Sequence, residues 1–186
     1  MALNEPAQLA VRMDDMGAFH AVNEAVMDIY RNGISRSVEV MPVAAWYPEA
    51  VKMLCDAPGL DVGLHLAITS EWENAKWRPL TDAISLVDAN GYFLPMIQPN
   101  PAYPGQSYGE RGYDLAEVEQ EFRAQIERVI KDLPQVSHIS SHMGCTFFTS
   151  ELQQLVQPLA DDYHLPSRDR TPSAPQGDKY DQYAPR

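Results

Sequence analysis

The sequence is poor in cysteine and in basic residues, and it has no long apolar run. Its two cysteines, Cys55 and Cys145, form neither a CxxC pair nor a disulfide framework, so we expect a reducing, cytoplasmic location. No apolar stretch approaches the ~20 residues of a membrane-spanning helix, which argues against a membrane partner. The first eight residues also lack the basic start and apolar core of a signal peptide.

The shortage of basic residues leaves the chain strongly acidic. It has 14 Lys and Arg against 26 Asp and Glu, a formal net charge of −12. Such a surface repels phosphate backbones, so we expect no nucleic-acid partner. Hydrophobic residues make up 45% and charged residues 22% of the 186 residues, which is ordinary for one globular domain.

Apolar periodicity predicts that strands and helices alternate along the chain. Strands are predicted at 9–13, 37–41, 60–66 and 136–141, and helices at 19–33, 48–55, 114–133 and 151–163. This alternation is typical of β/α units around a parallel sheet, so the expected fold class is α/β. Asp114 followed by Glu117 predicts a capping box at the start of the third helix.

The remaining segments are predicted from their turn residues and their polarity. Asn90-Gly91 lies between apolar runs and predicts a hairpin over 86–94 with a two-residue turn. Proline and glycine are frequent in 95–113, which predicts a long functional or disordered loop. Segment 166–186 has no Val, Ile, Leu, Met, Phe or Trp, so we expect a domain at 1–165 and then a disordered polar tail.

Ionisable side chains follow three of the predicted strands. They are Asp14 with Asp15, then His65, then His138 with His142. In a (β/α) barrel the carboxyl ends of the strands open onto one face, so these residues can converge. One carboxylate and two imidazoles form a set for a divalent ion, and a second carboxylate beside them can take a proton from water. The spacing alone also fits ordinary loop aspartates and structural histidines.

The amino-acid patterns of three segments favour the interpretation as a metal site. RMDDMG at 12–17, DVGLHL at 61–66 and SHISSHMG at 137–144 resemble, in this order, motifs of the YdjC-like (ChbG/HpnK) carbohydrate deacetylases. The resemblance extends over about residues 9–166. It implies an irregular or incomplete (β/α) barrel related to the polysaccharide deacetylases.

The resemblance also implies a role for each residue. By motif position Asp14 is the general base, while Asp15, His65 and His142 hold one divalent metal ion, either Mg²⁺ or Zn²⁺. The implied activity is hydrolysis of the N-acetyl group of an amino sugar or a short chito-oligosaccharide, which releases acetate and a free amine.

Aromatic and basic residues of the loops are candidates for binding this sugar. Trp72 and Arg78 follow the third strand, and aromatic rings commonly stack on pyranose faces. Tyr103, Tyr108 and Tyr113 in the long loop are weaker candidates of the same kind.

Three further residues of metal-binding type receive ordinary roles. We expect His138 to be structural or to support a ligand, because it shares a strand face with Ser140. His20 is expected at the surface or beside substrate, and Cys145 as a packed thiol.

Two departures from the family pattern support an alternative function. The family's third motif usually has Asp where this chain has Ser140, so the ligands lose a nearby charge. Related deacetylases also continue past Leu165 into further strands and a general acid. The alternative is therefore an inactive or truncated member that binds acetylated sugar or a partner without turnover. The exposed edges of an incomplete barrel predict a homodimer.

Overall fold

A computed structural model describes residues 10–167, and a parallel sheet forms their centre. The strands are β1 (Arg12–Met16), β2 (Ser37–Val40), β3 (Asp61–Leu66) and β4 (Val136–Ser141). They lie in the order β1-β2-β3-β4, and each neighbouring pair is parallel. The predicted α/β class is confirmed. Within residues 10–167 the sheet is open, with β1 at one edge, and it does not close into a barrel.

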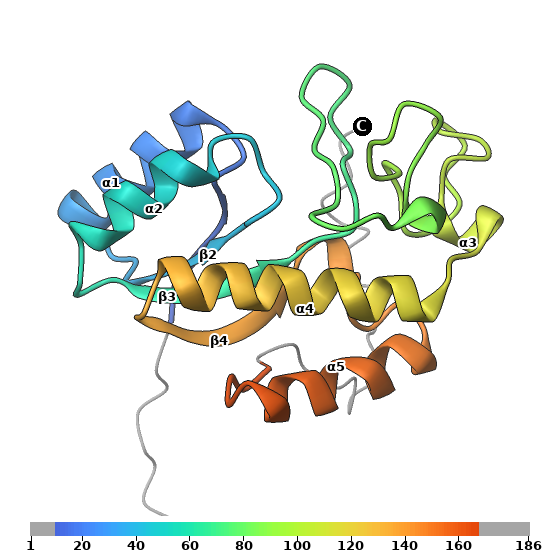
Figure 1. Cartoon of the computed structure of the whole chain (residues 1–186). Helices are drawn as coiled ribbons and strands as arrows, with labels where there is room; N and C mark the ends of the chain where they lie inside the picture. The colour runs from blue at the N-terminus through green and yellow to red at the C-terminus, as the bar shows by residue number, and fades with distance from the viewer. Residues whose placement is uncertain (1–9, 168–186) are drawn as a thin grey trace, which may run out of the picture.

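The helices lie between and beside the strands. They are α1 (His20–Asn32), α2 (Tyr47–Cys55), α3 (Tyr108–Arg111), α4 (Leu115–Asp132) and α5 (Ser150–Asp162), with short 3₁₀ turns η1 (Ile84–Leu86) and η2 (His142–Gly144). Helix α1 contacts α2 and β1, whereas α4 contacts β3 and α5 (Figure 1). The four predicted helices are confirmed to within a residue or two at each end.

The core forms where α4 covers the sheet. Val118, Phe122, Ile126 and Val129 share one face of α4 and are fully buried, as is Leu64 of β3. Their spacing of three and four residues places them on one stripe of the helix, which explains the amphipathic pattern. No helix in the described residues is both long and apolar enough to cross a bilayer.

The start of α4 differs from the predicted capping box. Asp114 caps the helix, since its carboxylate accepts a hydrogen bond from the Ala116 amide at 2.8 Å. The carboxylate of Glu117 instead accepts from the amide of Ser85 at 2.7 Å. The amide of Asp114 donates to the Ser85 hydroxyl, so a neighbouring loop takes the place of the reciprocal bond.

The first strand begins and ends about three residues later than predicted. It spans Arg12–Met16 and includes both aspartates, which were predicted to follow it. Met13 pairs with Val38 and Met16 with Val40, so β1 carries one more residue than β2 over this stretch. This irregularity is a β-bulge, which bends a strand and redirects its side chains.

The predicted hairpin over 86–94 is a wider turn. The hairpin itself forms, since an antiparallel bridge joins Val87 and Phe93. The amide of Asp88 donates to the carbonyl of Tyr92 at 2.8 Å and that of Gly91 to the carbonyl of Asp88 at 3.0 Å, so the turn takes three residues, 89–91, rather than the predicted two. The carboxylate of Asp88 accepts from the amide of Asn90 and thereby shapes the loop. Side-chain capture of a backbone amide by Asp competes with regular strand pairing.

The long loop 95–113 is partly ordered, and one of its candidate sugar-binding tyrosines is buried. It contains α3 and a parallel bridge between Met96 and Ser107. Tyr108 is buried, and its hydroxyl donates to a backbone carbonyl of the core. The predicted sugar-stacking role of Tyr108 is therefore wrong, because its ring is enclosed by the domain.

The chain continues along β4 after the last helix. Ser167 forms a parallel bridge with Ile139, and the amide of Ile139 donates to the carbonyl of Pro166 at 3.0 Å. Residues 168–186 of the predicted polar tail lie outside the described part of the chain.

Candidate metal centre

Three side chains of ligand type meet at the carboxyl ends of the strands. Asp15 lies in β1, His65 in β3 and His142 directly after β4, and one ligand atom of each lies within 4.8 Å of the others. An Asp15 oxygen is 3.0 Å from Nδ1 of His142 and 3.4 Å from Nε2 of His65. Both imidazoles are buried, while the Asp15 side chain is 44% exposed, so the cluster is open on one side.

Unusual backbone conformations direct two parts of this cluster. Asp15 has φ of 65° within the bulge of β1, and Met143, directly after His142, has φ of 52°. These values lie in the left-handed region, which costs residues other than glycine ~1–3 kcal/mol. The bulge points Asp15 toward the histidines, and the turn after β4 places His142 opposite Asp15.

The charges in the cluster depend strongly on one another. Burial alone would raise the pKa of Asp15, but hydrogen bonds and charge interactions with His142 and His65 lower it well below its ordinary value. Burial would lower the pKa of His142, but bonds to Asp15 and Glu71 raise it to about 9. Without metal, both ring nitrogens of His142 therefore donate, one to each carboxylate.

This charge pattern predicts how the stability of the metal-free protein varies with pH. The folded pKa of His142, about 9, lies above the unfolded value of 6.5. Its stabilising effect is fully present below pH 6.5 and is lost as the pH rises to about 9. We expect the free energy of unfolding to fall by on the order of 3 kcal/mol across this window, as measured by urea denaturation.

The variant His142→Gln isolates this effect from other groups that titrate in the same range. It retains hydrogen-bonding capacity but has no proton to lose, so its stability should change little between pH 6.5 and 9. An unchanged free energy of unfolding in the unmodified protein over that window contradicts the assignment.

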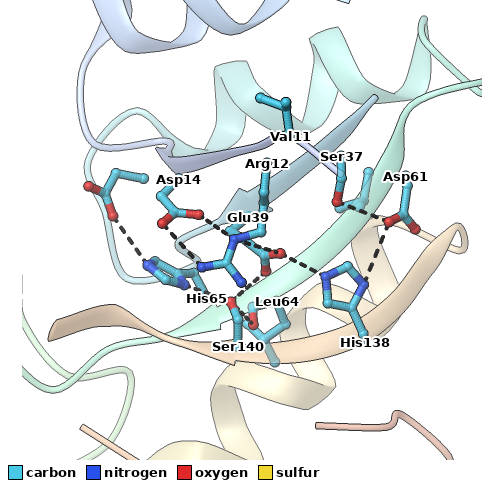
Figure 2. A network of polar contacts seen from close by, with 12 residues as sticks. Val11, Arg12, Asp14, Ser37, Glu39, Asp61, Leu64, His65, His138 and Ser140 are labelled. Carbon is cyan, nitrogen blue, oxygen red and sulfur yellow. Dashed lines mark hydrogen bonds and ion pairs between the residues drawn. The ribbon is translucent and has the colours of Figure 1, made fainter. Parts of the chain in front are cut away.

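Asp14 lies apart from the three clustered side chains. Its carboxylate accepts two hydrogen bonds from Arg12, at 2.7 and 3.2 Å, and its side chain is 45% exposed. Figure 2 shows Asp14 beside Arg12 above the sheet. The predicted general base is therefore adjacent to the cluster in sequence but is held by a guanidinium.

Glu71 is a site residue to which sequence reasoning assigned no role. It follows β3, and its Oε2 lies 3.1 Å from Nε2 of His142. The sequence feature that could have indicated Glu71 as a site residue is a carboxylate six residues after His65, in the loop that follows β3.

A small cavity of about 130 Å³ lies beside the cluster. Its polar lining includes Asp15, Glu71 and His142, and its aromatic lining Phe19, Trp72 and Trp77. Trp72 is 53% exposed and packs edge-on against Phe19, with ring centroids 5.6 Å apart. The candidate sugar-binding residue Trp72 therefore lies at the cavity, with one part of its ring in solvent.

Arg78, the other candidate for substrate binding, lies elsewhere. It lines a separate open groove with Thr81 and Asp82. Its guanidinium lies 4.3 Å from the centroid of the Tyr92 ring and donates to the carbonyl of Gly91. The structure does not bring Arg78 to the cavity beside Asp15, His65 and His142.

The residues expected to have ordinary roles have them. His138 is fully buried and contacts Glu39 at 2.7 Å. The thiol of Cys145 is buried and donates to the carbonyl of Leu66. His20 is exposed and pairs with a glutamate at 2.9 Å.

Comparison with known proteins identifies the family. The family model described as YdjC-like protein matches residues 8–185. This chain belongs to the YdjC-like family. Carbohydrate deacetylase 2 of Listeria innocua is 28% identical over 162 residues, which cover 87% of this YdjC-like chain and 60% of that protein. The carbohydrate deacetylase of Thermus thermophilus is 33% identical over 157 residues, covering 84% and 51% respectively.

A solved structure shows the same fold over most of the YdjC-like chain. It is an Enterococcus faecalis V583 protein named for a suggested role in cellobiose-phosphate cleavage. The TM-score is 0.74 at 27% identity, and the match covers 94% of this chain and 62% of that protein. The chain thus spans about 60% of the length of this structure and of the Listeria relative.

Proposed function

We propose that this YdjC-like chain binds one divalent metal ion and hydrolyses the N-acetyl group of an amino sugar or a short chito-oligosaccharide. The observation that carries the proposal is the convergence of Asp15, His65 and His142, whose ligand atoms lie within 4.8 Å of one another. Its membership of the YdjC-like family and its similarity to two proteins named carbohydrate deacetylases support the substrate class.

The donor set fits a divalent ion. The Ser140 hydroxyl is hydrogen-bonded to Nδ1 of His65 at 2.7 Å, so Nε2 of that ring faces Asp15 and the cluster. Two imidazoles with one carboxylate suit Zn²⁺, while Mg²⁺ prefers oxygen ligands alone. When bound, such an ion polarises the amide carbonyl and lowers the pKa of a coordinated water.

The cavity fits an acetamido group better than a whole sugar ring. Its volume of about 130 Å³ is below the roughly 300 Å³ at which pockets for drug-sized ligands begin. We infer that the acetamido group enters beside His142 and Glu71, while the pyranose ring stacks on the exposed part of Trp72.

Hydrolysis requires a carboxylate that takes a proton from the attacking water. We assign this role to Asp14 by its motif position, with Arg12 keeping its carboxylate oriented. Asp14→Asn should lower kcat for acetate release by ~10²–10⁴-fold without weakening zinc binding. Acetate release from chito-oligosaccharides and zinc titration of the same samples check this.

Glu71→Gln is the matched comparison for Asp14→Asn, because Glu71 lines the cavity and is not one of the three proposed ligands. We expect this change to affect zinc binding through His142 more than kcat. A large loss of kcat in Glu71→Gln with normal turnover in Asp14→Asn transfers the role to Glu71.

The second candidate function is binding of acetylated sugar without turnover. The uncharged hydroxyl of Ser140 beside His65 is the observation that favours it. In this case the unmodified, zinc-loaded chain releases no acetate, and Asp14→Asn leaves its affinity for chito-oligosaccharide nearly unchanged.

A further inference from the structure

A glutamate is buried in the middle of the sheet, below the metal centre. Glu39 of β2 is fully buried, and its carboxylate lies between His138 and Ser140 of β4 (Figure 2). One oxygen is 2.7 Å from Nε2 of His138, and the other is 2.5 Å from the Ser140 hydroxyl. Nε of Arg12 lies 3.6 Å from the first oxygen.

The register of the sheet makes these contacts possible. Glu39 pairs with Gly63 of β3, and Gly63 pairs with His138 of β4. Because Gly63 has no side chain, Glu39 and His138 meet over it. A Cβ added to Gly63 would overlap with both the carboxylate and the imidazole.

The Ser140 hydroxyl joins this carboxylate to the metal centre. Its Oγ is 2.7 Å from Nδ1 of His65 and 2.5 Å from Glu39. An ionised carboxylate only accepts hydrogen bonds, so the single proton of the hydroxyl points to Glu39. The hydroxyl oxygen is then left to accept from Nδ1 of His65, which must carry a proton.

We propose that Glu39 is a positioning residue for the metal centre: through the Ser140 hydroxyl, it holds the proton of His65 on Nδ1 and leaves the lone pair of Nε2 for the ion. The inference rests on the proposed metal site. It also locates the carboxylate that supports the ligand, since Ser140 carries no charge and Glu39 lies directly behind it.

The surroundings of Glu39 keep it in the accepting form. Burial alone would raise its pKa, but hydrogen bonds from His138 and Ser140 and the charge of Arg12 lower it below its ordinary value. Groups that orient a metal-bound histidine in this way typically change metal affinity 10–100-fold when they are removed.

The first test is zinc titration of the metal-stripped protein and its Glu39→Gln variant. A glutamine side chain has nearly the same size but carries an amide that donates as well as accepts. It no longer forces the direction of the Ser140 proton. We expect zinc affinity to fall ~10–100-fold, whereas equal affinities overturn the proposal.

A second variant places a carboxylate at position 140 in place of the one removed from position 39. In Glu39→Gln/Ser140→Asp, the new carboxylate at 140 accepts from His65 directly, and the glutamine amide donates to it. We expect zinc affinity to recover to near the unmodified value. Ser140→Asp alone sets two carboxylates in contact and should weaken zinc binding or folding. Failure of the double variant to recover while it remains folded also overturns the proposal.

The control is Glu121→Gln. Glu121 of α4 is equally buried, but its carboxylate accepts from Leu80, Thr81 and Gln125 rather than from the strand histidines. Its replacement should lower thermal stability without changing zinc affinity. An equal loss of zinc affinity in Glu121→Gln shows that general destabilisation explains Glu39→Gln, and contradicts the positioning role.

The tautomer itself is measured by ¹⁵N NMR of the imidazole of His65 in the metal-free protein. We expect the proton on Nδ1 in the unmodified chain, with a mixture of tautomers in Glu39→Gln and in Ser140→Ala, which keeps the Glu39 pair with His138. An Nδ1 that carries no proton in the unmodified chain refutes the inference, whereas a proton on Nε2 as well reflects the metal-free contact with Asp15. This readout needs no metal, so a chain that binds no zinc overturns the proposed function and still tests the tautomer.

Discussion

The His65→Ala protein is expected to bind no zinc in a calorimetric titration and to release no acetate from chito-oligosaccharides. His65 is one of the three ligands of the proposed metal site, and its ring is buried between Asp15 and Ser140. The alanine leaves two ligands, Asp15 and His142, which already pair with each other at 3.0 Å. Two ligands do not fix a divalent ion in a three-ligand site.

His20→Ala is the matched control for that loss. His20 is an exposed histidine that pairs with Glu49 and takes no part in the cluster. Its removal should leave zinc binding unchanged. Acetate release that survives His65→Ala rules out the proposed metal centre, whereas equal loss in His20→Ala points to a nonspecific effect on the sample.

The convergence of the three candidate ligands was predictable because it depends on a rule that applies to the whole sheet. Parallel strands end at a common edge, so polar residues at the carboxyl ends of separate strands converge even though 50 and 77 positions separate Asp15, His65 and His142. The apolar runs at 60–66 and 136–141 located β3 and β4 almost to the residue. The apolar pattern of each strand and the general topology of parallel sheets were therefore enough to predict that these three residues converge.

The buried carboxylate behind His65 was not predictable in the same way. Glu39 follows Val38 and precedes Val40 in a short strand, where alternation suggests a solvent-facing side chain. Its burial depends on partners that are 99 and 101 residues away, and on Gly63 across the sheet. Register is a property of strand pairs, which one strand's sequence does not specify.

The position of Asp14 depends on a similarly local irregularity. Sequence reasoning placed both aspartates in a loop and gave them neighbouring roles. The bulge in β1 separates them, since Asp15 turns toward His142 while Asp14 pairs with Arg12. A bulge adds one residue on one strand, and composition alone does not indicate where.

Gly63→Ala should be among the most damaging single-methyl additions to the sheet. A Cβ at this position would overlap with the carboxylate of Glu39 and the imidazole of His138, both fully buried. Overpacking a core costs ~1–3 kcal/mol, and disturbing the buried hydrogen bond between Glu39 and His138 adds to that. We expect a loss of about 3 kcal/mol and a fall in Tm of roughly 10 °C.

A double-mutant cycle separates this overlap from any general effect of alanine in β3. In the Glu39→Ala background the carboxylate is gone, so adding Gly63→Ala should cost markedly less than it does in the unmodified chain. Equal costs in both backgrounds contradict the contact between Glu39 and position 63. Because the same displacement moves Glu39 away from Ser140, the single variant Gly63→Ala should also bind zinc more weakly. The absence of a side chain at one strand position thus connects the stability of the sheet to the orientation of His65.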